Sequence, residues 1–298
     1  MNAIQNSRPL IRIIPAQQVS DGAGVKILRS LGLTQQLRLD PFLMLDCFGS
    51  DKPADYLAGF PAHPHRGFET VTYMLDGHMQ HQDHLGNIGQ LKSGGVQWMT
   101  AGRGIIHSEM PQQQDGLMRG FQLWLNLPAA EKMKAPAYVD LAPEQLRHLT
   151  LPGGGKAVLI AGDLHLGSGE HYAGPIQGLS TAPLYLDLQL KAAEQLSIQL
   201  PADHQALLYP FEGELNYQGH QLKSHQAGIL GSGSSLQLQA DQPVRLLLLA
   251  ARPLAEPVVQ YGPFVMNTAA EIEQAIRDYQ SGRLTDTVAG TLPVQPVR

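Results

Sequence analysis

Histidine is concentrated in one part of the chain. An even distribution of the 12 histidines would place about two between residues 63 and 107. Six lie there: His63, His65, His78, His81, His84 and His107. A single histidine is most often a surface residue or a satisfied core residue. Six together favour a cluster of metal ligands.

Two short motifs within this cluster have the spacing of metal ligands. His63-Pro64-His65 and His107-Ser108-Glu109 each place two donors at positions i and i+2, whose side chains point the same way on an extended chain. If the two segments are neighbours, three imidazoles and one carboxylate converge on one ion. Such donors suit iron, manganese, nickel, copper or zinc, and they leave up to two positions open on a six-coordinate ion, as in a catalytic site.

The other polar residues of this region are expected in lesser roles. His78, His81 and His84 follow the turn signal Asp76-Gly77, so we expect an exposed rim, with lining of the pocket mouth as the alternative. Glu69 shares the alternation of His63 and His65. This shared alternation allows a position near the metal, but we expect Glu69 to have a supporting or packing role.

The second half of the chain contains a weak copy of the first. The segments YMLDGHM (residues 73–79) and LKSGGVQWMTAG (residues 91–102) have counterparts in YPFEGEL (residues 209–215) and LKSHQAGILGSG (residues 222–233). Of the histidine motif only His204 remains, and no HxE follows near Gly231. The second copy is therefore predicted to be metal-free. The glycine-rich residues 151–155 predict a boundary between domains at 1–150 and 151–298.

The elements that must position these residues are mainly strands. Residues 68–75 are rich in β-formers, Leu184–Leu190 alternates apolar and polar positions, and an all-β class follows. Residues 128–133 suggest one short helical turn. The clearest helix covers residues 271–279, with Thr268 as its cap, Glu271 completing a capping box and Gly282 at its end.

Composition limits the class of protein. The 298 residues are 43% hydrophobic and 16% charged, with a net charge of -5, so we expect a globular protein that does not bind nucleic acid directly. Cys47 has no second cysteine to pair with, and no role is assigned to it. The longest apolar run, residues 246–251, is too short to cross a membrane, and residues 1–18 lack a signal-peptide core. We expect a cytoplasmic protein, most simply a monomer.

Longer motifs resemble a known family. The segment His63-Pro64-His65-Arg66-Gly67-Phe68-Glu69, with Gly77 after it, resembles the first motif of cupins. HPHRGFETVTYMLDG and QWMTAGRGIIHSEMP resemble the pirins, which are cupins with two barrels, as do LDPFLMLDCFG and GPFVMNTAAEIEQAIRDYQSGRL. The resemblance covers about residues 8–285. Cys47 departs from it, because an acidic residue is expected there.

The resemblance implies two jelly-roll barrels with a short C-terminal helix that packs back on the first barrel. It implies one metal ion, most often iron, held in that barrel by His63, His65, His107 and Glu109, whereas Glu69 is not a ligand. Several pirins are quercetin 2,3-dioxygenases. In that reaction the flavonol 3-hydroxyl binds the metal, Glu109 accepts its proton, and the enolate reacts with dioxygen, with ring opening and loss of carbon monoxide. Other pirins are protein-binding regulators, and a redox-sensing regulator of transcription or of a metabolic enzyme is the alternative function.

Overall fold

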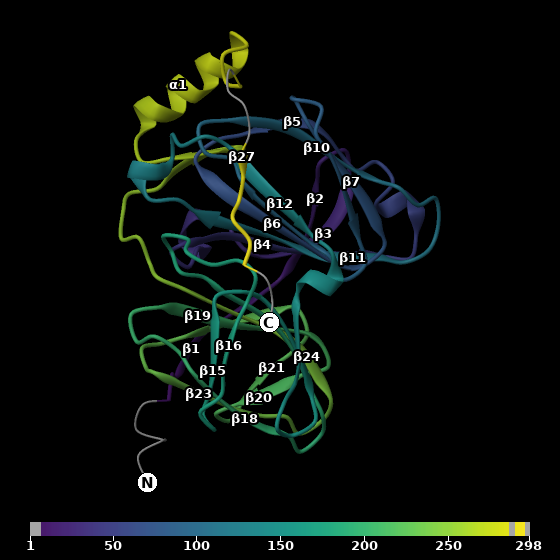
Figure 1. Ribbon diagram of the computed structural model, residues 1–298, viewed down its shortest axis with the longest axis vertical. Coiled ribbons are helices and arrows are strands. Elements are labelled where there is room, and N and C mark those ends of the chain that lie inside the picture. Colours follow the sequence, from purple (N-terminus) through teal and green to yellow (C-terminus); the bar gives the residue numbers. More distant parts are fainter. Residues whose placement is uncertain (1–6, 286–289, 296–298) are drawn as a thin grey trace.

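Strands dominate the structure of this chain, a computed structural model that describes residues 7–285 and 290–295 (Figure 1). The described residues form two β-barrels, one above the other in Figure 1, and a single α-helix, which confirms the predicted fold class. Short 3₁₀ turns lie at Gln35–Leu37, Pro53–Asp55, Ala129–Glu131 and Pro143–Gln145. No helix in the described part of the chain is long and apolar enough to cross a membrane.

The first barrel consists of two antiparallel sheets, apart from one parallel pair at an edge. The larger sheet has the order β2 (Gln17–Asp21), β3 (Val25–Leu31), β4 (Phe42–Ser50), β11 (Met118–Asn126), β6 (Phe68–Asp76), β9 (Val96–Thr100), β12 (Ala137–Leu141) and β27 (Gly290–Thr291). The smaller sheet has the order β5 (Phe60–His65), β10 (Ile105–Pro111), β7 (His78–Asp83) and β8 (Ile88–Lys92).

The second barrel has the same two-sheet plan. Its larger sheet has the order β1 (Leu10–Pro15), β22 (Gln226–Leu230), β19 (Gln205–Glu212), β24 (Val244–Ala251), β17 (Leu184–Leu190), β14 (Lys156–Ala161) and β13 (Arg147–Thr150). Its smaller sheet has the order β16 (His171–Ala173), β15 (Asp163–Leu166), β18 (Gln195–Gln199) and β23 (Ser235–Gln239). Two hairpins are separate: β20 (Leu215–Tyr217) with β21 (His220–Leu222), and β25 (Val259–Tyr261) with β26 (Phe264–Met266).

Strand alternation divides the apolar residues between two kinds of core. On β17 the even-numbered leucines face the interior of the second barrel, whereas Tyr185 joins the core between the barrels. On β6 the odd-numbered Val71 and Tyr73 join that same inter-barrel core. The two large sheets therefore pack against each other through one apolar layer.

The two barrel interiors differ in composition. The second barrel is filled by one continuous, leucine-rich cluster. The interior of the first barrel contains three smaller apolar clusters, around Met74, Phe68 and Met99, and buried polar side chains lie among them. Buried polar groups are retained where they find partners or perform chemistry. The first barrel is therefore the one built around a site.

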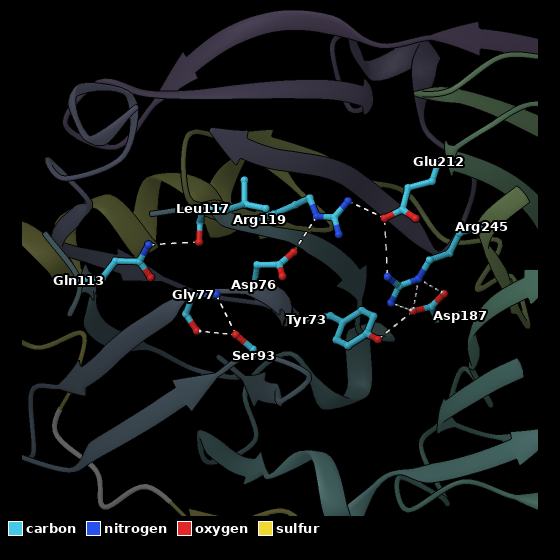
Figure 2. A network of polar contacts seen from close by, with 10 residues as sticks. All are labelled: Tyr73, Asp76, Gly77, Ser93, Gln113, Leu117, Arg119, Asp187, Glu212 and Arg245. Carbon is cyan, nitrogen blue, oxygen red and sulfur yellow. Dashed lines mark hydrogen bonds and ion pairs between the residues drawn. The ribbon is translucent and has the colours of Figure 1, made fainter. Parts of the chain in front are cut away.

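A network of charged side chains joins the barrels beside the apolar layer (Figure 2). Asp187 of β17 is 2% exposed and accepts hydrogen bonds from the Tyr73 hydroxyl at 2.8 Å and from the Arg245 guanidinium at 2.7 Å. Arg119 donates to Asp76 at 2.9 Å and, across the interface, to Glu212 at 2.5 Å. The buried carboxylate of Asp187 thus depends on a residue from each barrel.

Replacing Arg245 by leucine is expected to lower the free energy of unfolding by about 3–5 kcal/mol, because Asp187 would remain buried without its cation. The double variant Arg245→Leu/Asp187→Leu should recover most of that loss, since no unpaired charge remains. Denaturant unfolding of the three proteins measures both effects. A loss below about 1 kcal/mol for Arg245→Leu would show that the pair is not a buried one in solution.

Segments near both ends of the chain cross to the other barrel. Strand β1, near the N-terminus, pairs with β22 of the second barrel, and Arg8 ahead of it donates to the carbonyls of Gly231 and Pro201 there. Strand β13, at Arg147–Thr150, also belongs to the second barrel. The boundary after residue 150 stays a prediction, because each large sheet includes a strand from the distant part of the chain.

The C-terminal segment lies on the first barrel. Lys132 is 1% exposed, and its Nζ donates to the carbonyls of Gly67 (2.7 Å) and Val265 (3.0 Å) and to Oδ1 of Asn126 (2.6 Å). Arg66 donates to Asp278 at 2.7 Å. The tail is therefore attached beside the strand that carries the HxH motif.

The predicted helix is α1 (Ala269–Gln280), and its capping is confirmed. Thr268 Oγ1 accepts from the Glu271 backbone N–H, while the Glu271 carboxylate accepts from the Thr268 backbone N–H. Ile272 and Ala275 are buried on the inner face. Gly282, just past the end, adopts a φ of 71°, the left-handed conformation that glycine tolerates best.

The turn predicted at Asp76-Gly77 is present, but it does not form a β-hairpin. β6 and β7 do not pair; β6 lies in the larger sheet of the first barrel and β7 in the smaller one. Gly77 has a φ of 105°, so the turn is real, but it carries the chain around a corner between sheets. A turn signal specifies a reversal of the chain locally, while strand pairing depends on residues distant in sequence.

Candidate metal centre

Three of the predicted ligands converge inside the first barrel. His63 and His65 lie on β5, and His107 lies on β10 directly opposite His63. Their nearest donor atoms all lie within 4.8 Å of one another, and Nε2 of His63 is 2.9 Å from Nε2 of His65. Two ligands at right angles on one ion, each about 2.1 Å from it, are about 3.0 Å apart. The spacing of these nitrogens therefore fits a metal ion.

Burial keeps the deeper histidines neutral. His65 and His107 are 3% and 1% exposed, and burial lowers the pKa of both far below the usual range, with the neighbouring histidines adding to the effect. Both ring nitrogens of His107 lack a hydrogen-bond partner among the described residues. Buried unpartnered nitrogens are costly, and neutral imidazole is the form that binds metal.

His63 is held in an orientation suited to binding a metal. Its Nδ1 lies 2.8 Å from the Pro61 carbonyl, so Nδ1 carries the proton and donates it there. That tautomer leaves the lone pair on Nε2, the atom that faces His65. A backbone carbonyl in this position is a common means of orienting a metal-binding histidine.

Glu109 lies beside the three histidines rather than among them. It follows His107 on β10, but the pairing with β5 shifts between these two residues. Its carboxylate accepts from Thr72 Oγ1 at 3.2 Å and from Gln122 Nε2 at 3.1 and 3.3 Å. Gln122 is itself oriented, because its Oε1 accepts from Trp124 Nε1. The structure thus brings the three predicted histidines together. The fourth predicted ligand, Glu109, lies next to them and is hydrogen-bonded to Thr72 and Gln122.

The expectation of an exposed rim is wrong for His81. His81 lies within β7, is 2% exposed, and has its ring 4.9 Å from that of His107 and 5.6 Å from that of Tyr138. The error came from treating the segment after Gly77 as a loop, whereas it is a strand with one inward face. His78 and His84 are partly exposed, and His78 Nε2 lies 2.6 Å from Gln90 Oε1.

The alternation that Glu69 shares with His63 and His65 does not bring it to the three histidines. Its carboxylate accepts from Thr100 and Trp98, and it lies on the opposite face of β6 from Thr72, the residue that contacts Glu109. Alternation does not carry over from β5 because the chain turns between the strands, where Gly67 has a φ of 91°. The packing role is the one observed.

A cavity of about 570 Å³ opens beside the histidines. His63 and His65 line it together with Trp124, Met44 and Phe60. On another part of its wall, Arg29 donates two hydrogen bonds of 2.8 Å to the buried Asp46. The tail completes the lining with Gln260, Gly262 and Pro263. A small, flat molecule could therefore reach the two histidines of β5.

Sequence reasoning missed most of this wall. Gln122, Trp124, Arg29 and the tail come from segments far apart along the chain, and none forms a motif with the histidines. Cys47, given no role, is buried, and burial raises the pKa of its thiol to about 12. His204 is 7% exposed in the second barrel, and the only ligand group found among the described residues is the one in the first barrel. That the second barrel is metal-free stays a prediction.

Comparisons with known proteins decide the family. The family model described as Pirin matches residues 24–125, and that described as Pirin C-terminal cupin domain matches residues 185–285. This chain belongs to the pirin family. A protein of Pseudomonas aeruginosa named "putative quercetin 2,3-dioxygenase" is 50% identical over 280 residues, which are 93% of this chain and 98% of that protein. Human pirin is 38% identical over 286 residues, which are 93% of this chain and 94% of human pirin.

The pirin fold is also shared with a solved structure. The quercetin 2,3-dioxygenase of Acinetobacter baumannii superposes with a TM-score of 0.85 at 30% identity, covering 93% of this chain and 98% of that one. The expected resemblance to pirins and to two-barrel cupins is therefore confirmed. One structural neighbour of this pirin is thus a protein named quercetin 2,3-dioxygenase.

Proposed function

We propose that this pirin holds one divalent metal ion, iron in the native protein, through His63, His65, His107 and Glu109. The converging nitrogens, 2.9 Å apart for His63 and His65, carry the proposal. The unpartnered ring nitrogens of His107 support it, because a cation would satisfy one of them. Glu109 reaches the group by exchanging its hydrogen bonds to Thr72 and Gln122 for the metal.

We further propose that the protein is a flavonol 2,3-dioxygenase acting on quercetin or a similar substrate with dioxygen. The names of the relatives support this activity. So does the cavity, whose volume of about 570 Å³ lies in the range of small-molecule sites and whose wall includes flat and apolar side chains. A metal bound at this site would lower the pKa of a substrate hydroxyl and polarise its oxygen.

The residues of the chain have distinct tasks in this proposal. Trp124 and Phe60 line the space for the aromatic rings of the flavonol. Glu109 accepts the proton of the 3-hydroxyl as general base, since it is the carboxylate next to the histidines. Its contacts with Thr72 and Gln122 provide a second position in which the carboxylate is also hydrogen-bonded.

The experiment that tests the proposal uses the purified, full-length protein. Metal analysis is expected to give about one ion per chain, and oxygen uptake with quercetin should equal the carbon monoxide released. Protein stripped with a chelator should lose the activity and regain it with Fe²⁺. Full metal occupancy without oxygen uptake would reject the dioxygenase activity. The regulatory function would then remain, in which a monomeric cytoplasmic pirin binds a protein partner in a metal-dependent way.

A further inference from the structure

One buried histidine next to the site has no partner that explains its burial. His81 is 2% exposed, and neither Nδ1 nor Nε2 has a hydrogen-bond partner among the described residues. A neutral imidazole carries one donor and one acceptor, and each costs about 1–3 kcal/mol when buried unpaired. A side chain of this kind is expected where a partner arrives in another state of the protein.

Strand register places one carboxylate directly opposite His81. β7 and β10 are antiparallel, with His81 opposite Glu109 and Asp83 opposite His107. Side chains of opposed residues lie on the same face, with Cβ atoms about 4.5–5.5 Å apart. His81, His107 and Glu109 therefore all face the interior of the first barrel, and the rings of His81 and His107 are 4.9 Å apart.

The other carboxylates near His81 are already engaged. Asp83 accepts from the backbone N–H groups of Leu85 and Asn87, which closes the turn after β7. Asp140, on β12, accepts from Gln97 at 2.7 Å. Glu109 is the carboxylate that would change partners in the proposed metal site, because binding the metal would take it away from Thr72 and Gln122.

We propose that His81 is a positioning residue, which donates a ring N–H to the Glu109 carboxylate when that carboxylate binds the metal. This inference depends on the proposed metal site. Through the new hydrogen bond, His81 replaces donors that Glu109 gives up, and it fixes which oxygen of the carboxylate faces the ion. Residues that orient a ligand in this way contribute about 10- to 100-fold to metal affinity.

The test is a double-mutant cycle on the dissociation constant of Ni²⁺, measured by chelator competition with the full-length protein. His81→Leu should weaken Ni²⁺ binding at least about tenfold in the wild-type background. In the Glu109→Ala background the same change should have less than about a twofold effect, since the acceptor of the proposed hydrogen bond is gone. His81→Gln, which keeps a donor, should recover much of the affinity.

Stability of the metal-free protein provides a readout of opposite sign. His81→Leu removes two unpartnered buried nitrogens, so the metal-free variant should melt at or above the temperature of the wild type. If His81 were purely structural, its replacement would lower both the melting temperature and the affinity for Ni²⁺. His78→Leu is the matched control, because His78 is on the same strand and contacts Gln90 away from the site.

The outcomes separate this inference from the site on which it depends. Wild-type protein that binds no Ni²⁺ would overturn the proposed metal site itself. A wild type that binds Ni²⁺, with equal affinity in His81→Leu, would overturn the role of His81 alone. An equal loss in both backgrounds would show that His81 acts independently of Glu109, which also overturns the proposal.

Discussion

His107→Ala is expected to yield a folded protein whose metal affinity is lower by at least about a hundredfold. His107 is the proposed histidine ligand on β10, and without it only the two imidazoles of β5 remain together. Removal of a direct ligand should cost more than the 10- to 100-fold that is typical of residues behind the ligands. Metal content after dialysis against a weak chelator measures the effect.

The control for this variant is His78→Ala, which removes a histidine of the same sequence cluster outside the three-histidine group. It should keep the wild-type stoichiometry. If both variants retain full metal, the assignment of the site to His63, His65 and His107 is wrong. Circular dichroism of each protein establishes that the barrels are intact, so that loss of metal is not loss of fold.

Glu109→Gln is expected to reduce turnover of quercetin at least about a hundredfold, because the amide cannot accept the proton of the 3-hydroxyl. The substitution keeps the size of the side chain and can keep a hydrogen bond with Thr72 or Gln122. Rates must be compared per bound metal ion, since Glu109 is also a proposed ligand. Oxygen consumption, divided by metal content, is therefore the measurement.

Glu69→Gln is the matched control for the loss of one carboxylate in the first barrel. Glu69 is 1% exposed, bonded to Thr100 and Trp98 on the other face of β6, and burial raises its pKa. Its replacement should affect stability more than turnover. Equal rates per metal ion in Glu109→Gln and wild type would remove Glu109 from the chemistry, whatever happens in Glu69→Gln.

Local patterns predicted the parts of this molecule that depend on local physics. The i, i+2 spacing placed His63 and His65 on one face of β5, alternation placed the leucines of β17 inside the second barrel, and the capping box placed the start of α1. Each of these rests on interactions within a few residues. The family resemblance added the two-barrel architecture, which no single segment contains.

The errors arose where geometry depends on distant strands. Counting through a turn that changes the direction of the chain allowed a position near the metal for Glu69, although a supporting or packing role was the expectation. His81 was expected to be exposed because its partner strand β10 was not known. The resting position of Glu109 depends on Thr72 of β6 and Gln122 of β11. The local sequence does not predict these contacts between distant strands.

The crossing of the chain ends has a consequence for the order in which the protein can form during synthesis. The three clustered histidines have all been synthesised once the chain reaches residue 107. Part of the cavity wall beside them, however, is formed much later in the chain, by Gln260, Gly262 and Pro263. The large sheet of the second barrel, for its part, has β1 at its edge from the start of the chain. Domains of many proteins mature one after another as they leave the ribosome. Here neither barrel can be complete until nearly the whole chain has emerged, so a nascent chain arrested before residue 260 would expose the histidines to solvent metal without their finished pocket.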